Sequence, residues 1–106
     1  MKKVYVLLDR CGFPAHLNGT RYLAQAAIMQ GRASRPLMVT KEIYPAIAKA
    51  NETKAGAVER GIRGAVLEAT RSKVWATGWA AMGGGDDRPT NGEAICRFAR
   101  VLDHED

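Results

Sequence analysis

The sequence predicts an all-α fold, a compact bundle of five or six helices that contains a helix-turn-helix. Alanine is the commonest residue and aromatic residues make up only 7% of the chain, a balance typical of closely packed helices rather than β-sandwiches or barrels. Apolar residues recur at helical spacing along most of the chain. With 106 residues, 46% of them hydrophobic, residues 1–106 are expected to form one domain with its own core, without a metal or disulfide.

Two helices are expected in the first third of the chain. The first covers about residues 3–11 and stops before Gly12. The second covers about residues 18–29 and ends at Gly31, because glycine commonly follows the C-terminus of a helix.

A third helical segment covers about residues 40–50, with Thr40 as its candidate N-cap. Pro45 lies inside this segment and lacks a backbone N–H, so it either kinks the helix or moves the helix start one turn later. The apolar residues that should face the core are Ile43, Tyr44, Ile47 and Ala48.

The fourth helix is expected to follow a turn near residues 51–53 and to run from about residue 54 to residue 71. Thr53 is placed to cap its first free amides. At 100° per residue, six apolar residues of this helix fall within about 60° of Ile62 and form a core stripe. Its members are Ala55, Val58, Ile62, Ala65, Val66 and Ala69.

The opposite face of the fourth helix carries Arg60 and Arg63 among very small side chains. Each glycine inside a helix costs about 1 kcal/mol of helix stability relative to alanine. The presence of Gly56, Gly61 and Gly64 in one helix therefore indicates a function that offsets this loss. A helix that is pressed into a groove, with arginines reaching out from a smooth face, supplies one. The third segment, the turn and this helix together have the layout of a helix-turn-helix.

The last third of the chain predicts a short helix within residues 72–82, interrupted by Gly78, and then a glycine-rich loop over residues 83–87. Thr90 and Glu93 have the spacing of a capping box, which opens the final helix. The apolar face of that helix consists of Ile95, Phe98, Ala99 and Leu102.

The positive charge is concentrated in the middle of the chain. Residues 32–73 hold nine basic and four acidic residues, and this excess of +5 equals the net charge of the whole chain. A basic middle segment with neutral flanks is typical of a surface that binds phosphate groups. A solvated surface of lysines and arginines would give the same charge count.

Little in the sequence points to an enzyme, a cofactor or a membrane. Cys11 and Cys96 have no partner at metal-ligand spacing and are expected to be buried free thiols. The two histidines have no nucleophile or carboxylate at a recognisable spacing. The apolar start at residues 4–8 is far too short for a signal sequence or a membrane span, so we expect a cytoplasmic protein with no cofactor.

Four blocks of sequence resemble, in the right order, the C-terminal effector domain of the sporulation response regulator, stage-zero sporulation protein A. They include a Tyr-Pro inside a helix and a Val-Glu-Arg-x-Ile-Arg run, both unusual. The blocks are Gly12–Gly19, Thr40–Lys49, Val58–Arg63 and Pro89–Glu93. The resemblance implies an all-helical bundle that binds a short promoter box in double-stranded DNA and touches the sigma subunit of RNA polymerase.

The resemblance also implies roles for individual residues. Glu59, Arg60 and Arg63 match the recognition-helix residues that reach base edges in the major groove. The chemistry agrees, because an arginine fork can donate to two acceptors of guanine and a glutamate can accept from the amino group of cytosine. The alternative for Glu59 is an ion pair with Arg63 one turn later. The residues expected at phosphates, which set the register without reading sequence, are Lys49, Thr53 and Lys54.

Two departures from the family bear on affinity. Ala57 stands where the family tends to have an arginine, and Gly64 where it tends to have a histidine. The chain also begins just before its first helix, so we expect no receiver domain, and binding as a monomer or as a homodimer on tandem sites. The first hypothesis is therefore a sequence-specific, DNA-binding transcriptional regulator. The alternative is a protein-interaction module of the same fold that engages RNA polymerase or a full-length regulator.

Overall fold

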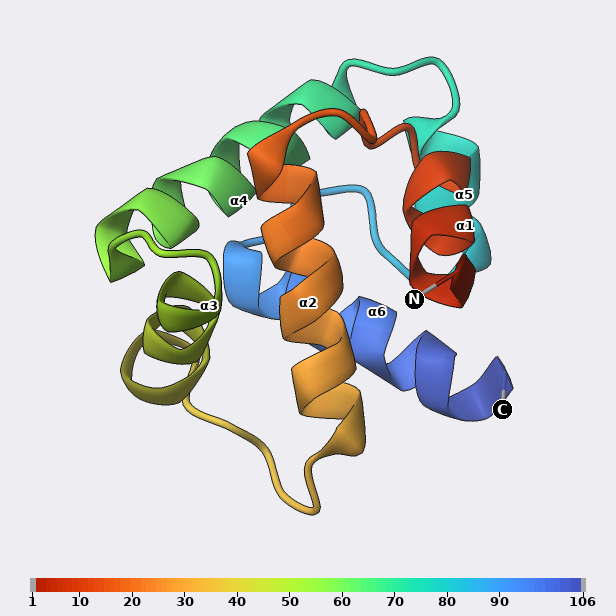
Figure 1. The fold of residues 1–106 in the computed structure, drawn as a ribbon. Coiled ribbons are helices and arrows are strands. Elements are labelled where there is room, and N and C mark those ends of the chain that lie inside the picture. Colours follow the sequence, from red (N-terminus) through yellow and green to blue (C-terminus); the bar gives the residue numbers. More distant parts are fainter. Residues whose placement is uncertain (1, 106) are drawn as a thin grey trace.

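The structure, a computed structural model, describes residues 2–105, and the side chains of residues 2–103. The described part of the chain consists of helices joined by loops and contains no strand, which confirms the all-α prediction (Figure 1). None of its helices is long and apolar enough to cross a membrane. The elements are α1 (Lys2–Arg10), α2 (Asn18–Arg32), the π-helical turn η1 (Val39–Ile43), α3 (Tyr44–Ala50), α4 (Ala55–Thr70), α5 (Trp75–Ala81) and α6 (Asn91–Glu105).

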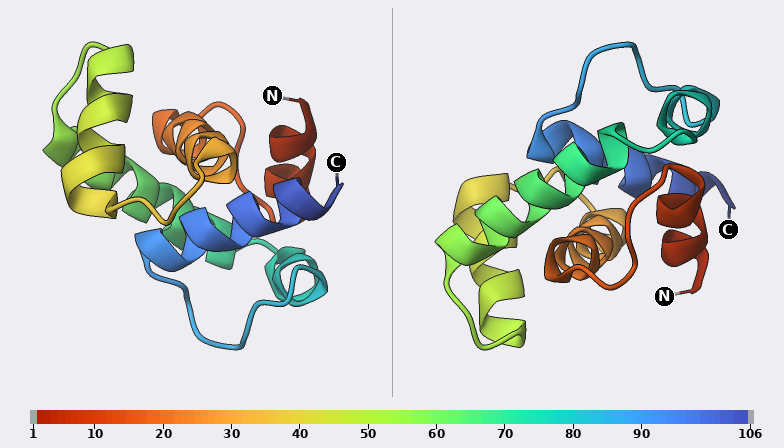
Figure 2. Two further views of the ribbon diagram at one scale, coloured as in Figure 1. Left: turned by 90° about the horizontal axis from the view of Figure 1, so that it is seen from below. Right: turned by 90° about the horizontal axis from the view of Figure 1, so that it is seen from above.

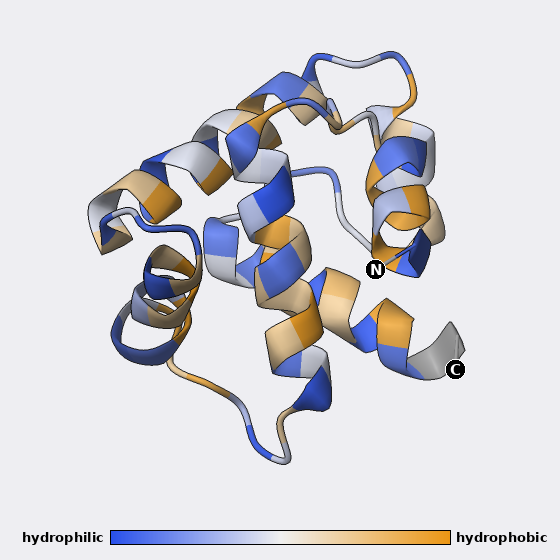
Figure 3. Cartoon of the chain, viewed as in Figure 1, coloured by the Kyte–Doolittle hydropathy of each residue, from blue (hydrophilic) through white to orange (hydrophobic). Residues whose placement is uncertain are grey.

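Helix α2 is the central element of the bundle. It packs against α4 and α6, and also contacts α1 and α3 (Figure 2). Ala24, Ala26 and Ala27 are fully buried in α2, and their small side chains let neighbouring helices approach it closely. Charged and polar residues lie mainly on the outward faces of the helices (Figure 3).

An aromatic cluster holds α5 against the rest of the bundle. The ring of Phe13 stands edge-on to Trp75 and to Phe98, with centroids 6.1 and 5.6 Å apart. Trp75 and Trp79 stack at 5.0 Å, and Trp79 also packs at 6.0 Å against Phe98 of α6. Aromatic pairs at these separations stabilise a core beyond their buried area, so the short helix α5 is well anchored.

Gly61 has a different role from the one expected of it. A Cβ atom on Gly19 of α2 would lie 1.8 Å from the carbonyl oxygen of Gly61, and a Cβ atom on Gly61 would lie 3.1 Å from the Tyr22 ring. These two glycines are therefore where the backbones of α2 and α4 cross in close contact. Gly61 serves helix packing inside the domain, and only Gly56 and Gly64 belong to the smooth outer face.

Two expected helix ends differ from the observed ones, and a third is confirmed. Helix α2 continues through Gly31 to Arg32, because the chain leaves it through the extended residue Ala33 and not through a left-handed glycine. Pro45 lies in the first turn of α3, where no N–H is needed, so the later start is confirmed. Thr40 does not cap this helix, because it lies inside the preceding π turn and no side chain caps α3.

One expectation for the last third is also corrected, and one is confirmed. Gly78 does not interrupt α5; instead, its missing Cβ would lie 2.1 Å from the carbonyl oxygen of Arg10 in α1. Thr90 and Glu93 do form the capping box, with bonds of 2.9 Å and 3.1 Å in the two directions. Helix α6, which packs against α2 and α4, therefore begins at a well-defined residue.

The two cysteines lie in opposite environments. Cys11 is fully buried, and burial raises the pKa of its thiol to about 11. Cys96 is exposed, so the expectation of a buried thiol was wrong at this position. The reason is local: Cys96 lies beside, not on, the apolar face of α6.

Candidate nucleic-acid interface

The connection between α3 and α4 is a tight, hydrogen-bonded turn. Glu52 adopts a left-handed conformation with φ of 54°. The N–H of Thr53 donates to the carbonyl of Ala48 at 2.9 Å, and that of Glu52 donates to Lys49 at 3.4 Å. This pair of bonds is the Schellman motif, which ends α3 and sets the direction in which the chain enters α4.

Thr53 does not cap α4, contrary to the expectation. The N-cap residue is Lys54, and no side chain bonds the first amides of the helix. The carbonyl of Lys54 instead accepts from Ala57 and Val58 at 2.9 and 3.1 Å. The helix therefore runs from Ala55 to Thr70, one residue inside each expected end, and the first amides of α4 have no side-chain acceptor among the described residues.

The apolar face of α4 lies against the core as its periodicity predicts. Val58, Ile62 and Ala69 are completely buried, whereas Arg60, Arg63 and Gly64 are exposed. A Cβ atom on Gly64 would meet nothing within 4 Å. The outer face of this helix is therefore an open surface of small residues from which two arginines extend.

Two of the three expected base-reading residues are paired with each other. Arg63 Nη1 lies 2.9 Å from Glu59 Oε2, an ion pair one helical turn apart. The third, Arg60, folds back over the helix, and its Nη1 would lie 3.1 Å from a Cβ atom on Gly56. The Arg60 guanidinium therefore lies beside Gly56, where the missing side chain leaves room for it, and the Arg63 guanidinium lies beside Glu59.

The residues expected at phosphates cluster around the turn. Lys49 lies in the last turn of α3, and Thr53 and Lys54 lie between that helix and α4. Both lysines are exposed and Thr53 is half-buried. Neither lysine has an ion pair among the described side chains, so their charges are available to an external anion.

Part of the basic middle is neutralised inside the domain. Arg35 bonds Glu42 through both guanidinium nitrogens, at 3.0 and 2.6 Å. The arginine and the Met38 amide hold the pKa of the Glu42 carboxyl at about 2, well below its usual value. Arg71 similarly pairs with Glu68 at 3.0 Å. The charge count over residues 32–73 therefore overstates the surface that is free to meet phosphates.

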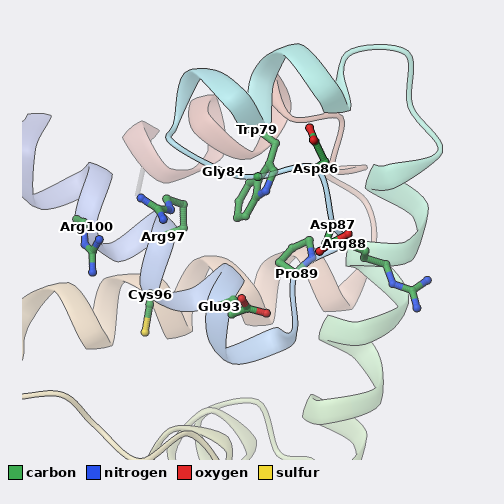
Figure 4. A pocket seen from close by; sticks show the side chains of 11 residues that line it. Trp79, Gly84, Asp86, Asp87, Arg88, Pro89, Glu93, Cys96, Arg97 and Arg100 are labelled. Atoms are coloured by element: carbon green, nitrogen blue, oxygen red, sulfur yellow. The ribbon is translucent and has the colours of Figure 1, made fainter.

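A pocket of about 520 Å³ lies beside α4, where η1 and α3 on one side meet the start of α6 on the other. Glu59, Arg63 and Tyr44 line it, together with Arg88 from the loop that leads into α6. Figure 4 shows Arg88 extending from this loop, apart from the side chains of Arg97 and Arg100. Arg88 was not predicted as a site residue, because only the tertiary structure brings the loop next to α4.

A second hollow lies on the other side of the same loop, between it and α6 (Figure 4). Its lining mixes Asp86 and Asp87 with Arg97 and Arg100, so opposite charges are combined there. The side chains that the structure describes form no group of three metal ligands. This hollow therefore has no donor set for a metal and no single charge for a polyanion.

The all-helical fold and the exposed face of α4 agree with one class, the small helical domains of helix-turn-helix type. The match to known families is specific. The family described as Sporulation initiation factor Spo0A C terminal matches residues 4–102, and the chain belongs to this family. The domain is thus a DNA-binding regulatory domain of a sporulation regulator family, which confirms the family resemblance.

Proposed function

We propose that this domain binds specific sites in double-stranded DNA by placing α4 in the major groove, and that it acts as a cytoplasmic transcriptional regulator. The exposed face of α4 carries the proposal. Arg60 and Arg63 extend from α4 next to Gly56 and Gly64, two outward positions without a side chain, so the helix backbone can approach the bases. A bidentate arginine on guanine is the commonest specific contact in the major groove.

Glu59 and Arg63 form the reading pair in this proposal. Their ion pair of 2.9 Å is exposed, and such pairs stabilise a helix by only a few tenths of a kcal/mol. It can therefore open at small cost when DNA offers better partners. Arg63 would then donate to a guanine and Glu59 would accept from the amino group of a cytosine.

The phosphate contacts would lie on the two sides of α4. Lys49, Thr53 and Lys54 lie around the turn that precedes it. Arg88 shares a pocket with Arg63 on another side, and we add it to the phosphate-contacting residues. The N-terminal end of α4 also favours an anion, because its helix dipole points its positive end toward the turn.

A binding titration tests the proposal. Fluorescence anisotropy would compare a duplex carrying the family's promoter box with a scrambled duplex, over a range of salt concentrations. We expect Arg60→Ala and Arg63→Ala each to reduce the preference for the box by about 1–3 kcal/mol. Lys54→Ala should weaken binding to both duplexes alike and reduce the slope of log K against log salt by about 1.

Arg100→Ala is the matched control, because it also removes one exposed positive charge but lies well along α6, away from the start of that helix (Figure 4). It should leave the preference unchanged. Equal affinity of the wild type for the box and the scrambled duplex would overturn the proposal. The stoichiometry on one box and on two tandem boxes would distinguish a monomer from a homodimer.

The second candidate function is a protein-interaction module that engages the sigma subunit of RNA polymerase or a full-length regulator. One observation favours it: Ala57, Gly64 and Leu67, which is 36% exposed, make the outer side of α4 less polar than a DNA-reading face requires. The affinity for a protein partner bound through this side would depend little on salt concentration. The same titration therefore separates the two functions, since DNA binding falls steeply as salt rises.

A further inference from the structure

One side-chain amide joins the three elements that surround the reading pair. Asn91 is the first residue of α6, and its Nδ2 donates to the hydroxyl oxygen of Tyr44 on α3 at 3.0 Å. The same nitrogen donates at 3.0 Å to the main-chain carbonyl of Glu59 in α4. Both bonds cross long stretches of sequence, 47 and 32 residues respectively.

The bond to α4 is made at the residue whose side chain pairs with Arg63. Glu59 is in the second turn of α4, and its carboxylate lies 2.9 Å from the guanidinium one turn later. The apolar contacts of Val58 and Ile62 hold the helix against the core, but hydrophobic contact has no direction. A hydrogen bond has a preferred length and angle, so the Asn91 amide restricts rotation and sliding of α4 at this position.

The partner on α3 is suited to a permanent bond. Tyr44 is 6% exposed, and burial raises the pKa of its hydroxyl above the ordinary value. The hydroxyl oxygen has lone pairs in either protonation state, so it is an acceptor for the amide at any physiological pH. Because α3 and α4 are both tied to one nitrogen, their relative position is coupled to the start of α6.

We propose that Asn91 is a positioning residue for base recognition, acting through the main chain of Glu59 and the hydroxyl of Tyr44 to set the orientation of α4. This inference rests on the proposed DNA-binding function. A shift of α4 by a fraction of an ångström would misalign Glu59 and Arg63 with base edges, while phosphate contacts through flexible lysines would adapt. Loss of the amide should therefore lower specificity and spare non-specific affinity.

The experiment compares three neutral variants with the wild type on the box duplex and the scrambled duplex. Asn91→Ala removes both hydrogen bonds, and we expect the preference for the box to fall about fivefold or more. Tyr44→Phe removes only the bond to α3, and we expect a smaller fall of about twofold. Affinity for the scrambled duplex and the slope of log K against log salt should stay at wild-type values in both.

Thr90→Ala is the matched control, because it removes a capping-box bond at the same end of α6 and leaves the two Asn91 hydrogen bonds to α3 and α4 in place. It should lower the melting temperature and leave the preference intact. A preference that Thr90→Ala reduces as much as Asn91→Ala would overturn the inference, as would wild-type preference in Asn91→Ala. If Asn91→Ala does not fold, unchanged preference in Tyr44→Phe overturns it. Absence of preference in the wild type would overturn the proposed function itself, and with it the inference.

Discussion

Three glycines in α2 and α4 should respond differently to the same added methyl group. Gly64 faces open space, Gly61 lies against the Tyr22 ring, and Gly19 lies against the Gly61 carbonyl. We therefore expect Gly64→Ala to stabilise the domain, Gly61→Ala to change its stability little, and Gly19→Ala to destabilise it strongly. The first two share one helix, so their helix-propensity gains are comparable.

The magnitudes follow from the distances that an added Cβ would have. Alanine in place of an interior glycine gains about 1 kcal/mol of helix stability, and Gly64→Ala should obtain nearly all of it. At Gly61 the ring atom 3.1 Å away must give by a few tenths of an ångström, which offsets most of that gain. At Gly19 the obstacle is backbone at 1.8 Å, so the two helices must separate, and we expect a loss of about 3 kcal/mol or more.

Urea unfolding followed by far-UV circular dichroism measures these changes, with an unchanged m value as the sign that the unfolding reaction is the same. In thermal melts the changes correspond to roughly 4–8 °C for each kcal/mol. The reasoning is refuted if Gly19→Ala is as stable as the wild type, or if Gly64→Ala is the least stable of the three. Gly64→Ala also serves as a test of the smooth outer face, because a methyl group there should weaken DNA binding without harming the fold.

Three other predictions concern single residues. Glu52→Gly should raise the free energy of unfolding by about 0.5–1 kcal/mol, because glycine has no steric penalty at φ of 54°. Glu52→Ala should not raise it, and equal melting temperatures of the glycine and alanine variants would contradict this prediction. Thr20→Val should stabilise the domain by about 1 kcal/mol in urea unfolding, because the buried Thr20 hydroxyl has no hydrogen-bond partner among the described residues. Thr20→Ser keeps the hydroxyl and should not stabilise the domain. A valine variant less stable than the wild type would refute the reasoning. The pKa of Glu42 is lower in the folded domain than its ordinary value of 4.5, so the stability it contributes is present above pH 4.5 and is lost as pH falls through about 2. The stability difference between the wild type and Glu42→Gln, measured across pH, should vanish at the acid end, and a difference that persists there would show that the bond to Arg35 is not its source.

The helices and their ends differ in how far the sequence predicts them. The apolar stripe of α4 and the capping box at Thr90 and Glu93 were predicted correctly, because both depend on residues within a few positions of one another. The caps expected at Thr40 and Thr53 were wrong, because Thr40 lies inside the π turn before α3, and Thr53 lies in the Schellman motif that ends α3, one residue before the N-cap position of α4. A threonine at an expected N-cap position shows that a side chain is able to accept from the first amides of a helix. It does not show at which residue the backbone begins the helix.

The residues of the candidate site also differ in how far the sequence predicts them. The arginines on the outer face of α4 follow from helical periodicity and from four blocks of family-like sequence, and those blocks match the family found for residues 4–102. The roles of Gly61, Asn91 and Arg88 do not follow from their neighbours in sequence. They depend on contacts with Gly19, the Glu59 carbonyl and the pocket beside α4, each far away along the chain.

By itself, therefore, the sequence determined the helical class, the family and the face of α4 that carries the charged residues. Helical periodicity, turn-forming residues and local spacing depend on only a few neighbouring residues, so they can be recognised in the sequence without knowledge of the fold. The tertiary structure alone decided which glycines pack helices together and which amide orients α4. Those properties arise where α2, α4 and α6 meet, and close packing couples residues whose positions in the sequence are unrelated.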